Sequence, residues 1–133
     1  MKLITYAITV VGVAVLSLST ISSAHAAAAD RDYVCESLYM EQSYDCAIEA
    51  VIVEKKRLNK IYMTAYRTLD KHEKEQLDKE QIAWLKARSE QCDFEHDGPM
   101  NNTVVYAMIN SDVCTANETQ KRSKVMAKRY NIK

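Results

Sequence analysis

The fold is decided by one stretch that contains neither Gly nor Pro, SLYMEQSYDCAIEAVIVEKKRLNKIYMTAYRTL (Ser37–Leu69). Its apolar residues recur at helical spacing, which predicts a long helix with one apolar face. These residues are Ile48, Val51, Ile52, Leu58, Tyr62, Ala65 and Leu69. The pattern Asp70-x-x-Glu73 is a capping box and predicts a second helix from about Lys71 to about Cys92. Because the connection is short, we expect the two helices to form an antiparallel hairpin.

The C-terminal part predicts two further, shorter helices. Asp93–Asn102 is rich in Asp, Asn and Gly-Pro and is typical of a loop. A third helix is expected from Val104 to about Val113. A second capping-box pattern, Thr115-x-x-Glu118, predicts a basic fourth helix that ends near Tyr130. With only 2 Gly and 1 Pro in 133 residues, an all-β fold is excluded. We therefore expect a small all-α domain.

The first residues have the pattern of a secretory signal peptide. Lys2 precedes the apolar run Leu3–Leu18, and Ala24-His25-Ala26 is an A-x-A cleavage pattern. A transmembrane anchor is the alternative, but an apolar run of about 16 residues is short for a bilayer core of ~30 Å. We expect residues 1–26 to be a signal peptide and residues 27–133 to be one domain. The product would be periplasmic or secreted, and no Cys stands at the cleavage point to carry a lipid.

Four cysteines remain in the expected mature chain: Cys35, Cys46, Cys92 and Cys114. In an exported protein they predict two disulfides. A metal site is the rival interpretation, but only Cys92 and His96 have helical ligand spacing, and two ligands do not make a zinc site.

The pairing of these cysteines stays open. If residues 37–46 are helical, Cys35 and Cys46 lie more than about 12 Å apart along the axis. A disulfide needs Cα atoms within about 7 Å. A local Cys35–Cys46 bond is therefore disfavoured, unless the helix starts later. We expect the disulfides to fasten the open end of the hairpin to the flanking segments.

The formal net charge of +0 conceals a strong polarity along the chain. Residues 27–54 hold seven acids and one base, whereas residues 118–133 hold six bases and one acid. The two groups could attract each other within the fold, or one could form a surface that steers a charged partner. The balanced total excludes the overall basic charge of a typical nucleic-acid binder.

Motifs for catalysis are missing from the sequence. His72-Glu73 begins a zincin-like pattern, but Gln76 stands where the second His would be, so H-E-x-x-H fails. The expected mature chain has a single Gly, Gly98, and hence no Gly-rich phosphate loop. We expect a protein that is not an enzyme and that carries no metal and no cofactor.

A constellation of polar and aromatic residues lies on the predicted hairpin. Gln81, Trp84 and Arg88 share one face of the second helix. Residues whose numbers sum to about 140 should lie side by side, which pairs Asn59 with Gln81 and Tyr62 with Asp78. We expect a partly buried polar layer, in which Asn59 and Gln81 can hydrogen-bond and Arg88 stacks on an aromatic ring or pairs with a carboxylate. A ligand-binding stripe is the alternative.

These residues also carry a resemblance. The pattern consists of the four cysteines and the scaffold residues Leu58, Asn59, Tyr62, Leu77, Gln81, Trp84, Arg88, Thr119 and Arg122. It resembles the lysozyme-inhibitor LprI-like N-terminal domain family and covers nearly the whole expected mature chain. The resemblance implies a small exported helical protein of the bacterial envelope, and inhibition of lysozyme for the eponymous member. This chain departs from the pattern at Lys55, at Gly98-Pro99 and at Met126, and it lacks the lipidation Cys.

Two functions follow. The first is binding and inhibition of lysozyme or a related peptidoglycan hydrolase, through the acidic residues Glu36, Glu41, Asp45 and Glu49 or through a loop that carries Asp93, Glu95, His96 and Asp97. That loop could also merely connect two helices. The second is a structural or interaction module of the envelope without inhibitory activity. Its basic helix Lys121–Lys133 would then dock on a partner or on anionic lipid.

Overall fold

The computed structural model describes residues 31–94, 99 and 101–133. Within them it contains three α-helices and no strand: α1 Met40–Thr68, α2 Lys71–Gln91 and α3 Asn102–Arg129. The all-α prediction is therefore confirmed. The expected signal peptide, residues 1–26, lies outside the described residues.

A membrane-spanning segment was also sought among the described residues. None of their helices combines the length and the apolar character that a bilayer crossing requires.

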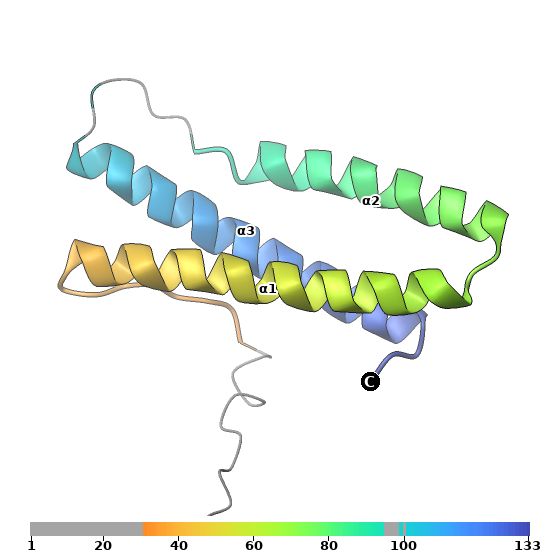
Figure 1. Ribbon diagram of the computed structural model, residues 1–133. Coiled ribbons are helices and arrows are strands. Elements are labelled where there is room, and N and C mark those ends of the chain that lie inside the picture. Colours follow the sequence, from red (N-terminus) through yellow and green to blue (C-terminus); the bar gives the residue numbers. More distant parts are fainter. Residues whose placement is uncertain (1–30, 95–98, 100) are drawn as a thin grey trace, which may run out of the picture.

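Helices α1 and α3 form the most extensively packed pair of the molecule (Figure 1). Ala47 and Ala50 of α1 and Ala116 of α3 are almost completely buried. Their small side chains allow the two helices to approach closely, and dense packing of this kind leaves no room for extra atoms. Ile109 of α3 packs in the same cluster as Ala47. The pair runs side by side in one direction, while α2 returns in the other.

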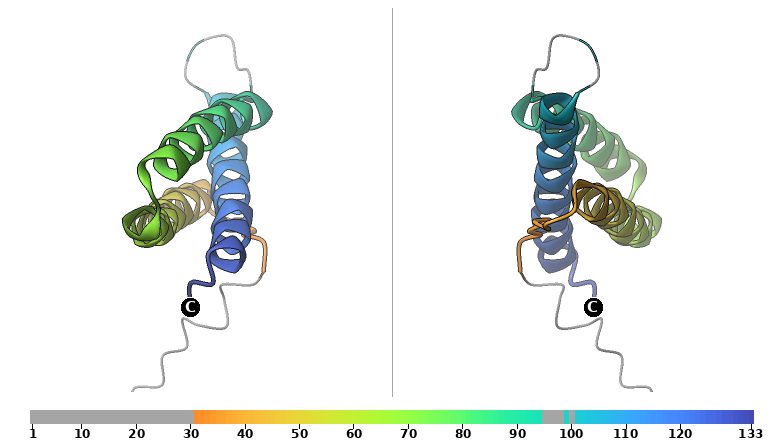
Figure 2. Two further views of the ribbon diagram at one scale, coloured as in Figure 1. Left: turned by 90° about the vertical axis from the view of Figure 1, so that its right-hand side faces the viewer. Right: turned by 90° about the vertical axis from the view of Figure 1, so that its left-hand side faces the viewer.

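Helix α2 lies beside this pair (Figure 2) and is attached to it at a few points along its length. At its start, Asp70 accepts a hydrogen bond from the Glu73 amide and Glu73 accepts one from the Asp70 amide, so the predicted capping box is confirmed. At its end, Cys92 is bonded to Cys114 of α3. Leu77 is the one buried residue of α2, and it packs in a cluster with Met126 of α3.

The register predicted for the first two helices agrees with one contact between them. The Tyr62 hydroxyl of α1 donates to the Asp78 carboxylate of α2. Burial and the neighbouring carboxylate both raise the pKa of Tyr62. This hydrogen bond ties the second half of α1 to the first half of α2.

The two predicted C-terminal helices are one continuous helix, α3. The Thr115 pattern was misread, because the Thr115 carbonyl accepts a bond from the Thr119 hydroxyl at 2.6 Å inside the helix. The true cap is Asn101, whose side chain accepts from the Val104 amide. Ala116, the position at which the fourth helix was predicted to begin, is fully buried. Packing of an unbroken helix against α1 therefore outweighs the local capping signal.

Helix α3 ends at Arg129, and an asparagine with left-handed backbone follows two residues later. Asn131 has φ 52°, a conformation that Asn tolerates better than most residues. The Ile132 amide then donates to the Ala127 carbonyl at 2.9 Å, and the Asn131 amide to the Lys128 carbonyl at 3.4 Å. This is a Schellman motif. It turns Ile132 back onto the cluster that contains Met126.

The first predicted helix starts three residues later than expected, at Met40. Residues 31–39 are not helical and are held by α3. The Asn117 side chain accepts from the Tyr33 amide at 2.6 Å and donates to the Tyr33 carbonyl at 3.2 Å. Gln120 donates to the Arg31 carbonyl at 3.2 Å.

This later start resolves the cysteine pairing. Cys35 lies in the non-helical segment and is bonded to Cys46, with the Cα atoms 5.6 Å apart. A helix that began at Ser37 would have disfavoured the Cys35–Cys46 bond. Because the helix begins later, at Met40, this bond forms, as the stated exception allows. As expected, each disulfide fastens a helix of the predicted hairpin to a flanking segment.

Candidate functional site

The polar layer predicted from the sequence lies between α2 and α3. Both the Arg88 and the Arg122 guanidinium groups lie over the Trp84 ring, at 4.9 and 5.7 Å from its centroid. Arg88 donates to the Thr119 hydroxyl at 3.1 Å, and Arg122 donates to the Gln81 carbonyl oxygen at 3.2 Å. Five of the scaffold residues named from the sequence therefore meet in one layer.

This arrangement corrects one expectation and confirms another. The Gln81 oxygen is bonded to Arg122, not to Asn59, because α3 lies closer to that face of α2 than a two-helix picture could show. Arg88 stacks on an aromatic ring, as predicted. Burial lowers the pKa of Arg88. Cation–π contacts of this kind contribute about 0.5–2 kcal/mol each, so the layer holds α2 on α3.

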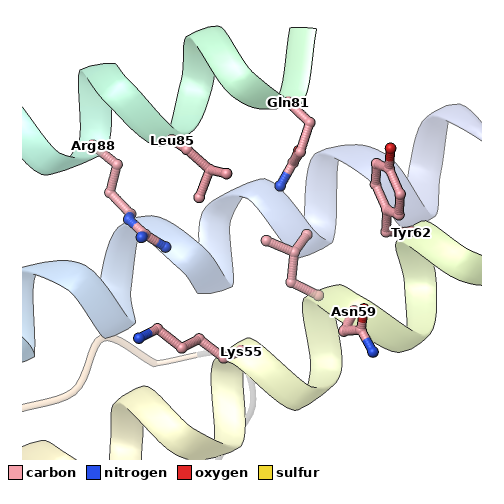
Figure 3. Close-up of a pocket in the computed structure, with 7 residues that line it drawn as sticks. Lys55, Asn59, Tyr62, Gln81, Leu85 and Arg88 are labelled. Atoms are coloured by element: carbon pink, nitrogen blue, oxygen red, sulfur yellow. The ribbon is translucent and has the colours of Figure 1, made fainter. Parts of the chain in front are cut away.

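A cleft of about 290 Å³ opens between α1 and α2 (Figure 3). Leu58 and Leu85 give it an apolar part, while Lys55 and Arg88 approach it from opposite helices. Asn59, Tyr62 and Gln81 complete the lining. The structure thus places Asn59 and Gln81 at the same cleft, as the register predicted.

Three of the acidic residues named from the sequence lie along the first turns of α1, beside the start of α3 (Figure 1). Glu41, Asp45 and Glu49 are exposed and recur every four positions, so they form a stripe along α1. Residues 32–54 and 102–120 contain no Lys or Arg. We call residues 36–49 together with residues 102–110 the acidic end. Among the described residues, Glu41, Asp45 and Glu49 take part in none of the ion pairs of the molecule.

An apolar hollow lies beside the acidic stripe. It measures about 340 Å³ and is lined by Met40, Glu41, Tyr44, Val105 and Met108. Three large apolar residues close to these in the sequence are exposed. The exposed fraction is 99% for Leu38, 66% for Tyr39 and 53% for Tyr106. Large exposed apolar groups gathered in one region are typical of a protein-binding surface. The acidic end therefore combines apolar contact area with a single sign of charge.

The predicted loop site is only partly described. Asp93 is exposed, whereas Glu95, His96 and Asp97 lie outside the described residues. No group of three or more His, Cys, Asp or Glu side chains with metal-site geometry occurs among the residues that the structure describes.

One acid of the N-terminal stretch has a structural role that sequence reasoning missed. Glu54 is fully buried; it accepts from the Tyr33 hydroxyl at 2.8 Å and pairs with Arg57 at 3.1 Å. Burial and this carboxylate raise the pKa of Tyr33 to about 12. The sequence contained a signal for this burial, because Glu54 lies between the buried positions Val51 and Leu58 at helical spacing.

The basic residues of α3 are largely engaged within the molecule. Lys121 pairs with Glu118 at 2.8 Å, and Arg129 pairs with Glu80 of α2 at 2.6 Å. The Arg129 contact lowers the pKa of Glu80. Part of the charge polarity seen in the sequence therefore stabilises the attachment of α2 to α3, and does not face a partner.

Comparison with known proteins gives one family. The search found no significant match among curated proteins or solved structures. The family model described as "Lysozyme inhibitor LprI" matches residues 35–129, a range that contains all three helices and both disulfides. The disulfide-bonded helical scaffold and this match lead to one conclusion: the chain belongs to the lysozyme inhibitor LprI family.

Proposed function

We propose that this protein is exported and inhibits lysozyme or a related peptidoglycan hydrolase by binding it, without catalysing a reaction. The observation that carries the proposal is the acidic end, where an acid stripe borders an apolar hollow. Lysozymes are usually basic, and opposite charge speeds the encounter of two proteins and selects the partner. The family match supports the choice of partner.

The covalent structure supports the proposed compartment. Both cysteine pairs are disulfide-bonded, and free cysteines are absent among the described residues. Disulfides of this kind persist in oxidising compartments such as the periplasm or the extracellular space. Export would place the inhibitor where lysozyme reaches the cell wall.

The two features of the acidic end would have different tasks. The stripe Glu41, Asp45 and Glu49 would steer the encounter, because exposed charges act over about 10 Å at 0.1 M salt. The hollow between Met40 and Met108 would receive an apolar or long side chain of the partner, which is where binding energy concentrates in protein interfaces.

A cell-wall lysis assay tests this proposal. Purified protein should slow the clearing of a bacterial suspension by lysozyme. The double variant Glu41→Gln/Asp45→Asn should raise the concentration for half-inhibition about tenfold, or ~1.4 kcal/mol. The control Glu75→Gln/Glu90→Gln removes the same charge from α2 and should leave that concentration unchanged. Unchanged lysis and no binding to any hydrolase would contradict the proposal.

The alternative is a structural or interaction module of the envelope with no inhibitory activity. Its lipid-binding form is disfavoured, because Lys121 and Arg129 are already ion-paired. Within Lys121–Lys133, Met126 is buried, and Val125 is the large apolar residue that is exposed. A membrane-surface helix needs a strong exposed apolar face. Binding to anionic vesicles at low salt, together with unchanged lysis, would favour this alternative.

A further inference from the structure

The cleft between α1 and α2 presents two cations that have no carboxylate within ion-pair distance among the described residues. Lys55 comes from α1 and Arg88 from α2, and Figure 3 shows both charged groups directed into the same end of the cleft. Asp112 of α3 interacts with Lys55 through space: burial raises the pKa of Asp112, and Lys55 lowers it in part. Asp112 does not line the cleft, and neither does any other acid that the structure describes. The cleft therefore carries a net positive charge.

Unused hydrogen-bond donors lie next to these charges. Arg88 donates one hydrogen bond to the Thr119 hydroxyl, whereas a guanidinium has five N–H donors. The Gln81 oxygen is occupied by Arg122, which fixes the amide so that its NH2 group points into the cleft (Figure 3). The Trp84 ring under Arg88 holds the guanidinium in place. The donors are thus oriented before any ligand arrives.

The remainder of the lining sets the size and polarity of the ligand. Leu58 and Leu85 line the same cleft. Figure 3 shows Leu85 next to Arg88, and Leu85 exposes 40% of its surface. The volume of about 290 Å³ is at the small end of the roughly 300–1,000 Å³ that ligand pockets occupy. An anion with one small apolar group attached fits this description, whereas an extended polymer does not.

We propose that this cleft binds the C-terminal carboxylate of a short peptide. The carboxylate lies between Lys55 and Arg88 and accepts from the Gln81 amide, while the last side chain of the peptide contacts Leu58 and Leu85. A guanidinium and a carboxylate match in geometry and form the stronger class of hydrogen bond. This site is separate from the acidic end and does not depend on the proposed inhibition.

The chain supplies its own reporter for such binding. Trp84 is the single Trp of the sequence and lies against Arg88, so a ligand on the guanidinium should change its fluorescence. The probe is N-acetyl-Ala-Ala with a free carboxylate, and the matched control is the same dipeptide as its C-terminal amide. Inorganic phosphate serves as a second anion without an apolar group.

We expect a saturable change in Trp84 fluorescence with the free acid and binding at least about tenfold weaker with the amide and with phosphate. Lys55→Gln should weaken binding of the acid about three- to fivefold, as loss of one exposed ion pair does. Lys56→Gln, an adjacent exposed lysine outside the cleft lining, should leave binding unchanged.

Three outcomes would overturn the assignment: no saturable change with the acid, equal binding of acid and amide, or equal binding of phosphate. Circular dichroism of the variants excludes unfolding, since both lysines are exposed. No hydrolase enters this experiment, so its failure would leave the proposed inhibition untouched.

Discussion

Helix α2 and the α1–α3 pair are held by different means. In the pair, small residues such as Ala47 and Ala116 are buried and the helices touch along their length. In α2, Leu77 alone is buried, and attachment comes from the Asp70 turn, the Trp84 layer and the Cys92–Cys114 disulfide. One region is a packed core, and the other is a helix fastened at discrete points.

This difference assigns different tasks to the two regions. Because α2 contacts its neighbours at only a few points, a cleft remains between α2 and α1. Lys55 and Arg88 line this cleft. The packed pair instead presents a rigid acidic end. We therefore expect substitutions in the two regions to change the free energy of unfolding by different amounts.

The largest single-residue effect is expected for the buried anchor of α2. Leu77→Ala should lower the free energy of unfolding by about 2–5 kcal/mol, because it removes a fully buried side chain and leaves a cavity. Leu85→Ala changes the same residue type in the same helix, where the side chain is 40% exposed, and should cost less than about 1 kcal/mol. Urea denaturation measures both, and equal costs would contradict a single anchor.

Removal of the α2 disulfide should have the next largest effect. Cys92→Ala/Cys114→Ala opens a loop of 22 residues and should cost about 2–4 kcal/mol. Amide hydrogen exchange should then accelerate throughout α2 while α1 and α3 stay protected. Cys35→Ala/Cys46→Ala serves as the control, since it should accelerate exchange near residues 31–46 and not in α2. Uniform acceleration in both variants would refute independent fastening of α2.

A pair of alanines compares the two regions with one type of substitution. Ala116→Leu inserts a large side chain between α1 and α3 and should lower the free energy of unfolding by about 1–3 kcal/mol. Ala87→Leu makes the same change at an exposed position of α2 and should stay within about 0.5 kcal/mol of the parent. Thermal or urea unfolding of both variants checks the expectation, and tolerance of Ala116→Leu would mean that the pair is loosely packed.

The smallest effect at neutral pH concerns Tyr33, which ties the non-helical segment to Glu54. Its pKa is raised from 10.0 to about 12, so the folded state favours the protonated hydroxyl. The resulting stability is fully present below pH 10 and is lost as the pH rises through 12. Tyr33→Phe should remove this part of the alkaline loss, measured as the free energy of unfolding at pH 9 and pH 11.5. An identical pH dependence in both proteins would contradict the role of the hydroxyl.

The sequence predicted those features that local chemistry determines. The capping box at Asp70, the helix class and the stacking of Arg88 on an aromatic ring all rest on short-range patterns. The Tyr62–Asp78 contact followed from the short turn alone. These predictions held because neighbouring residues supply all the interactions involved.

The features that were missed depend on α3, whose position no local pattern gives. Thr115 resembles a cap, but Ala116 is buried against α1 and keeps the helix continuous. Asn117 and Gln120 hold residues 31–33, and the first helix starts only at Met40, which allows the Cys35–Cys46 bond. The apolar hollow beside the acid stripe likewise needs Val105 and Met108 from α3.

The most direct test of the proposed inhibition is an NMR titration of isotope-labelled protein with unlabelled lysozyme. The acidic end should respond, so amide signals of residues 40–49 and 102–110 should shift or broaden in a saturable way, and those of α2 should stay in place. Raising the salt concentration should weaken the effect, because exposed charges are screened. Perturbation confined to α2, or no perturbation at millimolar lysozyme, would contradict binding through the acidic end.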